Sequence, residues 1–251
     1  MLHSSLKSFG RIDGGAETLI RAFLNLGCTL VVPAFTYDCA IPPPPGRELR
    51  QNGWEAAPGV FDAQGFVPYD KDSVMVSREM GAIPARVLQM DGRARGVHPL
   101  NSFAAFGPLA DELIAAQTLL DVYGPLKALA ARPPAWLVLA GVDLTRATPI
   151  HLAEELSGRR LFRRWAGTID GEQLEVAVGS CSEGFNRLAS AVWHIETRAT
   201  VGKSDWRVYP FGAFINAVVG AIGQDQTITH CEDLGCVRCN DAVKGGPILE
   251  G

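Results

Sequence analysis

The chain has 251 residues, of which 47% are hydrophobic and 20% are charged, and this is the composition of an ordinary globular protein. Its net charge of −4 comes from interspersed acidic and basic residues, so the sequence favours neither a nucleic acid nor a membrane as a partner. No apolar stretch approaches the roughly 20 residues that span a bilayer. The first residues also lack the pattern of a signal peptide, and we therefore expect a cytoplasmic protein.

The first third of the chain predicts a helix, a strand and a long loop, in that order. Apolar residues recur at helical spacing over residues 14–26, and a short apolar run at 29–32 predicts a buried strand that ends at Pro33. Over 37–72 the regular pattern disappears, and proline and glycine are frequent. A connection this long is usually either functional or disordered, so we expect a lid or substrate-side loop, with a mobile surface loop as the alternative.

The middle of the chain predicts an α/β architecture. Helical spacing returns over 108–120. An apolar run at 136–141 predicts a strand, and a short loop leads from it to a helix that starts near Thr148. Strand, loop and helix in this order are typical of layered α/β proteins.

The last third predicts a hairpin, two helices and an irregular tail. Asp170-Gly171 separates two strand-like runs at 164–169 and 173–178, and this dipeptide suits the tight turn of a β-hairpin. Helices are expected at 183–195 and 209–222, and a cysteine- and glycine-rich tail follows over 229–251.

One short segment contains the residue types that catalysis needs. Thr148 followed by Pro149 is typical of a helix start, in which the hydroxyl caps the helix and proline takes the first position. His151 is then the third helical residue, and Glu154 lies on the same face three residues later. The helix N-terminus disfavours imidazolium, which keeps His151 neutral and able to accept a proton. We expect Glu154 to orient the ring or to stabilise the cation formed after proton transfer.

The same segment offers a donor for a developing negative charge. The Thr148 hydroxyl, or the amides of the nearby helix, can donate a hydrogen bond to an oxyanion that grows on a thioester carbonyl. The alternative for this segment alone is a histidine that is bonded locally in a helix cap.

The segment resembles the signature helix of the aminoglycoside 3-N-acetyltransferase family, in which a strand ending in G-V leads to T-x-x-H-x-x-E. The resemblance extends in order and spacing over about residues 2–160. It includes His3-Ser4-Ser5-Leu6, Gly14-Gly15-Ala16-Glu17, Thr29 to Thr36, and a central block of Met80-Gly81, Pro84, Arg86, Arg95, His98-Pro99 and Ser102-Phe103-Ala104-Ala105.

The resemblance implies an acetyl-CoA-dependent enzyme with the three-layer α/β/α sandwich of antibiotic N-acetyltransferases, as a single domain over residues 1–251. His151 is implied as the general base, with Glu154 as its partner and Thr148 beside them. Carried over by position, the residues at the CoA pyrophosphate are Ser4, Ser5 and Leu6, with Arg95, His98 and Ser102 nearby. Hydroxyls and backbone amides after a short strand are suited to binding phosphate oxygens.

The sequence also departs from the family pattern. Members usually have another helix and strand start before the block at His3, so we expect either a misplaced start codon or a domain trimmed at this edge. Residues 95–99 read R-G-V-H-P where R-S-x-H-P is frequent, and residues 124–126 read G-P-L where G-x-x-S-P-L is frequent. These changes predict an altered acceptor side, with the choice of acceptor made by the loops near 37–72 and 96–126.

The cysteines of the tail have the spacing of metal ligands. Cys231, Cys236 and Cys239 form C-x4-C-x2-C, and Cys181 lies 50 residues upstream of the first. Four thiolates brought together by the fold would make a closed, structural zinc site that fixes the tail to the hairpin region. Unligated thiols and an iron–sulfur cluster are the alternatives, although a plant-type [2Fe–2S] protein has its fourth cysteine downstream.

These observations predict transfer of an acetyl group from acetyl-CoA to an amine of an aminoglycoside or similar amino sugar, without an acyl-enzyme, and hence an antibiotic-resistance activity. Two alternatives stay open: the same chemistry on another amine metabolite, and a catalytically silent, zinc-stabilised binding protein. The partner is then a small molecule, and the sequence is compatible with a homodimer.

Overall fold

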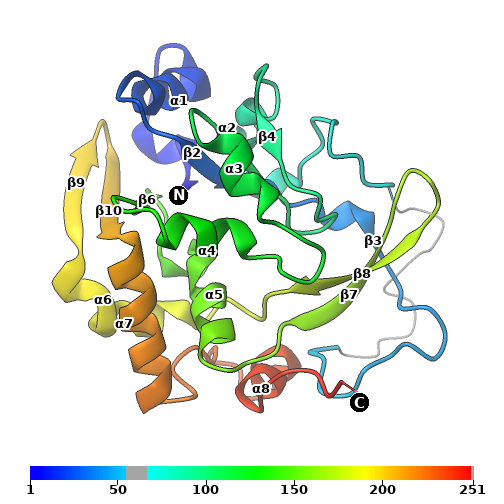
Figure 1. Cartoon of the computed structure of the whole chain (residues 1–251). Helices are drawn as coiled ribbons and strands as arrows, with labels where there is room; N and C mark the ends of the chain where they lie inside the picture. Colours follow the sequence, from blue (N-terminus) through cyan, green and yellow to red (C-terminus); the bar gives the residue numbers. More distant parts are fainter. Residues whose placement is uncertain (55–66, 250–251) are drawn as a thin grey trace.

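The structure, a computed structural model, describes residues 1–54 and 67–249. Its strands form three sheets, and its helices pack around them (Figure 1). The helices are α1 (Gly15–Asn25), α2 (Ala82–Val87), α3 (Ala110–Ala115), α4 (Gly124–Ala130), α5 (Pro149–Leu156), α6 (Ala189–Val192), α7 (Phe211–Gln224) and α8 (Val237–Val243). The α/β class expected from the sequence is confirmed.

The first sheet has the order β1-β6-β10-β9, with bounds Leu2–Ser4, Trp136–Ala140, Ser204–Pro210 and Thr197–Val201. β1 runs parallel to β6, and the other neighbours are antiparallel. The second sheet has the antiparallel order β2-β5-β4, formed by Leu30–Pro33, Phe103–Phe106 and Ala94–Arg95. The third has the antiparallel order β3-β7-β8, formed by Ala40–Ile41, Phe162–Gly167 and Gln173–Val178.

β6 is apolar along its length because both of its faces are covered. Leu137 and Leu139 belong to the larger hydrophobic cluster, which also contains residues of α5 and α7. Val138 and Ala140 point the other way, since side chains alternate along a strand, and they join the cluster that includes Ile20 of α1. A sheet buried on both faces gives a continuous apolar run instead of an alternating one.

Several expected elements are present with different extents. The helix expected at 108–120 ends at Ala115, and a separate helix, α4, follows it. The helix expected at 183–195 is a succession of short turns in which only Ala189–Val192 is α-helical. The loop expected at 37–72 contains a 3-10 turn at Tyr37–Cys39 and the strand β3, and its residues 55–66 lie outside the described residues.

The elements around α5 determine where the site lies. α5 packs against α7, and the β7–β8 hairpin leads back toward the start of α5 (Figure 1). The hairpin turns at Asp170-Gly171, as predicted, with Phe162 paired to Val178 and Gly167 to Gln173. Within the described residues, no helix is long and apolar enough to cross a membrane.

Candidate active site

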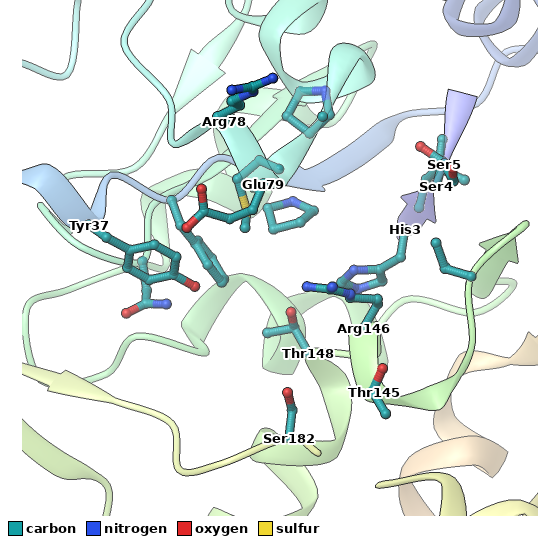
Figure 2. A pocket seen from close by; sticks show the side chains of 18 of the residues that line it. His3, Ser4, Ser5, Tyr37, Arg78, Glu79, Thr145, Arg146, Thr148 and Ser182 are labelled. Carbon is teal, nitrogen blue, oxygen red and sulfur yellow. The ribbon is translucent and has the colours of Figure 1, made fainter. Parts of the chain in front are cut away.

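A cavity of about 1160 Å³ lies between β1, the start of α5 and the end of β8. Its lining comes from segments far apart in the sequence: the N-terminal strand, the turn around Tyr37, the segment 78–84, the loop after β6 and residues 178–185. Figure 2 shows Thr148 in the middle of the site, with His3, Ser4 and Ser5 on one side and Tyr37 and Glu79 on the other. The volume exceeds the roughly 300–1,000 Å³ of a pocket for one drug-sized ligand.

The α5 helix begins differently from the sequence expectation. Thr148 has helical torsion angles itself (φ −48°, ψ −32°), and its side chain makes no capping hydrogen bond. The reason is that a 3-10 turn at Leu144–Arg146 leads almost directly into the helix, and the Thr148 carbonyl accepts the His151 amide at 3.0 Å. The predicted hydroxyl cap is therefore wrong. The Thr148 side chain faces the cavity instead (Figure 2).

His151 lines the cavity and is held by Glu154. Its Nδ1 lies 2.9 Å from Glu154 Oε2, and its side chain is 12% exposed. An ionised carboxylate accepts hydrogen bonds only, so Nδ1 carries the proton and Nε2 keeps a lone pair. The ring packs edge-on against Phe185 at 4.8 Å and parallel to Tyr123 at 6.3 Å between centroids. The spacing that the sequence provided therefore brings the two residues together as expected.

Glu154 is buried and fully engaged. Besides His151, its Oε2 accepts the Ser180 hydroxyl at 2.9 Å. Its Oε1 accepts the Arg159 guanidinium at 2.6 Å and the Thr229 hydroxyl at 2.9 Å. Burial by itself raises the pKa of this carboxyl, but its hydrogen bond to His151 and the charge of Arg159 hold the pKa below its usual value. Glu154 therefore stays ionised and fixes the orientation of the imidazole.

Gly179 provides the space for the His151 ring. A Cβ at this position would lie 2.6 Å from His151 Cγ and 2.6 Å from the Tyr123 hydroxyl oxygen. Both distances are far below van der Waals contact. The chain after β8 therefore approaches His151 so closely that only glycine leaves the ring in place.

The residues expected at the CoA pyrophosphate separate into two groups. Ser4, Ser5 and Leu6 line the cavity, as do the cationic side chains of Lys7 and Arg11. Hydroxyls and cations at one end of a cavity are suited to phosphate groups.

Arg95, His98 and Ser102 do not belong to the lining, and their contacts lie in the protein interior. Arg95 donates to the carbonyls of Ser73, Ala34 and Met75 and to the Ser102 hydroxyl. His98 Nε2 lies 2.8 Å from the Ala177 carbonyl, and its Nδ1 accepts the amides of Leu100 and Asn101. These contacts fix the segments behind the cavity wall.

The four predicted metal ligands meet in space. The sulfur atoms of Cys181, Cys231, Cys236 and Cys239 all lie within 4.8 Å of one another, and Cys231 and Cys239 Sγ are 3.5 Å apart. The hydrogen bond between Cys181 and Cys239 lowers the pKa of Cys181 and raises that of Cys239. The cluster adjoins the active site, because Cys181 follows Ser180 and Cys231 lies two residues after Thr229.

The profile of the family described as aminoglycoside 3-N-acetyltransferase matches residues 1–222. The chain belongs to this family. It is 30% identical over 173 residues to aminoglycoside N(3)-acetyltransferase VIII of Streptomyces fradiae. The matched region covers 64% of this chain and 56% of the relative. The chain thus spans little more than half the length of the curated relatives that it matches.

Solved structures of the family share the fold. The apoenzyme of aminoglycoside acetyltransferase AAC(3)-IVa superposes with a TM-score of 0.76 at 21% identity, over 97% of this chain and 89% of that one. AAC-IIIb, solved as a binary complex with CoASH, gives a TM-score of 0.69 at 19% identity, over 89% of both chains.

Sequence reasoning missed several residues of this candidate site. Ser180, Arg159 and Thr229 hold Glu154, yet none of them stands at a spacing from it that signals contact. Tyr123 and Phe185 pack on the His151 ring from two other segments. Only the Asp170-Gly171 hairpin, which returns the chain toward α5, hinted at where Gly179 and Ser180 would lie.

We expect Gly179→Ala to displace the His151 ring and to lower turnover by about 10²-fold, which is the usual cost of misplacing a catalytic group by about 1 Å. Affinity for CoA should be retained, because Gly179 follows β8 of the third sheet, whereas Ser4, which we expect near the CoA pyrophosphate, belongs to β1 of the first sheet. Steady-state kinetics and a CoA titration test this. Gly212→Ala in α7 is the matched control, since nothing lies within 4 Å of the Cβ it would add. Unchanged turnover in Gly179→Ala would contradict the packing account.

His98 should make stability depend on pH. Burial lowers its pKa to about 4, whereas the unfolded chain has the ordinary value of 6.5. The unfolded state therefore binds more protons between these values, and stability falls as the pH drops from 6.5 toward 4, by about 3 kcal/mol. Urea unfolding at pH 7 and pH 4.5 measures the loss, and His98→Gln should show a smaller pH difference than the unaltered protein. An equal difference in both would refute the assignment.

Proposed function

We propose that this chain transfers the acetyl group of acetyl-CoA to a primary amine of an aminoglycoside or similar amino sugar, with His151 as the general base. The observation that carries the proposal is the orientation of the imidazole. Glu154 occupies Nδ1, while Nε2 makes no hydrogen bond to any described residue and the ring lines the cavity. A neutral histidine with a free lone pair in a cavity is suited to removing a proton from an attacking nucleophile.

The coenzyme end of the cavity fits acetyl-CoA. Ser4 and Ser5 supply hydroxyls, and Lys7 and Arg11 supply positive charge for a ligand with several phosphate groups. These residues lie on β1 and the turn after it, beside the loop that follows β6. The complex of AAC-IIIb with CoASH shows that this fold accommodates the coenzyme. Arg95, His98 and Ser102 do not line the cavity, and their hydrogen bonds support the surrounding segments from the interior.

Thr148 is the donor that we assign to the oxyanion. The amides of Ile150 and His151 are already bonded to the carbonyls of Ala147 and Thr148, so they are not available. The Thr148 hydroxyl makes no hydrogen bond within the described part of the chain and faces the cavity one helical turn from His151. It can therefore donate to the thioester oxygen as negative charge develops there.

The proposed reaction is a direct transfer. The amine nitrogen attacks the thioester carbonyl while His151 Nε2 accepts a proton from that nitrogen. Glu154 stabilises the imidazolium that forms, without being protonated itself. The C–S bond then breaks, the acetyl group remains on the amine, and the CoA thiolate leaves with the proton that His151 returns. The products are the amide and free CoA, and no acyl-enzyme forms.

We further propose that the cysteine cluster holds one structural zinc ion. Four sulfur ligands at the Zn–S distance of about 2.3 Å in a tetrahedron stand roughly 3.8 Å apart. The separations of up to 4.8 Å among the four sulfur atoms are close to this spacing. A two-iron cluster needs a wider cage, because its thiolates bind two different metal atoms. The ion would connect the end of β8 to the tail on either side of Glu154.

Replacing the base tests the catalytic assignment. His151→Ala and His151→Asn should lower turnover by about 10²- to 10⁴-fold while the Kd for CoA stays within about twofold of the unaltered value. Thiol release from acetyl-CoA measures turnover, with gentamicin, apramycin, amino sugars and simple amines as acceptors; AAC(3)-IVa has been crystallised with the first two. Turnover at the unaltered rate in either variant would show that His151 is not the base.

Metal analysis tests the zinc site. The purified protein should contain close to one zinc ion per chain, and Cys236→Ser should lose it and unfold at a lower temperature. Cys28→Ser is the control, because Cys28 is exposed and lies outside the cluster. Folded, metal-free protein would refute the site, and iron in place of zinc would assign the cluster differently.

A further inference from the structure

The cavity is far more basic than the protein as a whole. Although the chain carries a net charge of −4, the described cavity lining contains two carboxylates, Glu79 and Glu183. Against these stand six cationic side chains: Lys7, Arg11, Arg78, Arg146, Arg164 and Arg238. An acidic protein that concentrates positive charge in one cavity is arranged to bind anions there.

Four of these arginines have no acidic partner among the described residues. Arg86, Arg132 and Arg159 pair with carboxylates elsewhere in the molecule. By contrast, no described carboxylate forms an ion pair with Arg78, Arg146, Arg164 or Arg238. Their charges are therefore not neutralised within the described chain.

Arg164 and Arg238 lie on the side of the cavity away from the coenzyme end. Arg164 belongs to β7 in the third sheet, and Arg238 belongs to α8 in the cysteine-rich tail. Ser4 and Ser5, in contrast, belong to the first sheet and the turn that follows it. Thr148 and His151, at the start of α5, line the same cavity. Lys7 and Arg11 remain beside the serines to bind the phosphates of CoA.

The Arg164 guanidinium is fixed in position by carbonyl groups. Its Nη1 donates to the Asn52 and Arg163 carbonyls at 2.9 and 2.8 Å, and its Nη2 donates to the Gly53 carbonyl at 3.2 Å. Burial, together with the charge of Arg238, lowers its pKa to about 10. Arg164 and Arg238 line the same cavity, and like charges that face one cavity are costly unless an anion joins them.

Tyr37 lines the same cavity as these arginines. Burial and the charge of Glu79 raise the pKa of its hydroxyl to about 12, and the charges of Arg146 and Arg238 oppose this rise. In Figure 2 the Glu79 carboxylate and the Tyr37 hydroxyl point toward one another. The cavity thus combines two carboxylates, Glu79 and Glu183, which are suited to an ammonium group, with several unpaired arginines.

We propose that Arg164 and Arg238 form an anion subsite, so that the acceptor is an amine, such as an amino sugar, that also carries a phosphate or carboxylate group. This inference rests on the proposed acetyl transfer and specifies its substrate class. A polycationic aminoglycoside would bring further positive charge to a surface that is already positive. An anionic amine would place its negative group against the guanidinium groups and its amine toward His151.

A matched series of acceptors tests the proposal. Glucosamine, glucosamine 6-phosphate and glucosaminic acid share one carbon skeleton and differ in having no anion, a phosphate or a carboxylate. Thiol release should give a kcat/KM for at least one anionic member that exceeds that of glucosamine by about ten- to a hundredfold, which is the usual effect of a charged hydrogen bond. Gentamicin should be a poorer acceptor than either of the two anionic members. Higher activity with gentamicin or glucosamine than with both anionic members would overturn the subsite.

Arg238→Gln is the decisive variant, because Arg238 is exposed and its side chain makes no described hydrogen bond that folding would lose. It should abolish the preference for the anionic acceptor, mainly through KM, while activity toward glucosamine changes little. Arg47→Gln is the control, since Arg47 is exposed and does not line the cavity. A preference that survives in Arg238→Gln would refute the subsite.

Two further measurements separate this proposal from its rivals. If Arg238→Gln weakened CoA binding or lost the zinc ion, the arginine would serve the coenzyme or the cysteine cluster, and the subsite would be refuted. If no acceptor supported thiol release, the proposed function would fail, yet the subsite could still be measured. Calorimetric titration of the CoA-loaded protein should then detect binding of glucosamine 6-phosphate or glucosaminic acid but not of glucosamine. This binding should be lost in Arg238→Gln. If neither anionic compound bound, the subsite would be refuted.

Discussion

The buried charge of Glu154 is the constraint on which the site depends. The carboxyl is 4% exposed, and an ionised group at such depth costs several kcal/mol unless hydrogen bonds and an opposite charge compensate it. Four donors do so, and they come from four parts of the chain: His151 on the same helix, Arg159 after it, Ser180 after β8 and Thr229 in the tail. The third sheet and the tail must therefore dock on α5 before this charge is stable.

This arrangement connects catalysis to the tail. Thr229 donates directly to Glu154, and Arg159 reaches both Thr229 and the Gln226 carbonyl. The cysteine cluster joins the residue after Ser180 to the segment that begins two residues after Thr229. The proposed zinc ion at that point would keep both hydroxyls in place on opposite oxygens of one carboxylate. The tail thus contributes to the orientation of the imidazole, in addition to any contribution to stability.

The sequence predicted those features that depend on local spacing. The pairing of His151 with Glu154 follows from the geometry of a single helix, and the β7–β8 hairpin follows from its Asp-Gly turn. The buried strand β6 could be predicted because its continuous apolar run is visible in the sequence without knowing which strands pair with it. The meeting of the four cysteines was also inferred, because thiol spacing is a strong constraint.

Features that depend on pairing between distant segments were not predictable in this way. The β9–β10 hairpin was missed because every residue of β9 is exposed and no alternation of apolar residues marks it. The short strand β1 is stabilised by its parallel neighbour β6, which lies more than 130 residues away. The expected cap at Thr148 failed because the preceding 3-10 turn, which has no strong sequence signal, already satisfies the first amides of the helix.

The residues that we assign to the reaction are close in sequence, whereas those that we assign to the choice of acceptor come from distant segments. Thr148, His151 and Glu154, to which we assign the oxyanion donor, the base and its carboxylate, all lie within two turns at the start of α5. The proposed acceptor side is assembled from β7, α8 and the turn at Tyr37, three segments that meet only in the folded chain. Substitutions in any of them can change the charge that the acceptor meets without disturbing the base. For this reason, membership in the acetyltransferase family constrains the chemistry of this chain more strongly than it constrains the amine, and the unpaired arginines become the most informative residues for the acceptor.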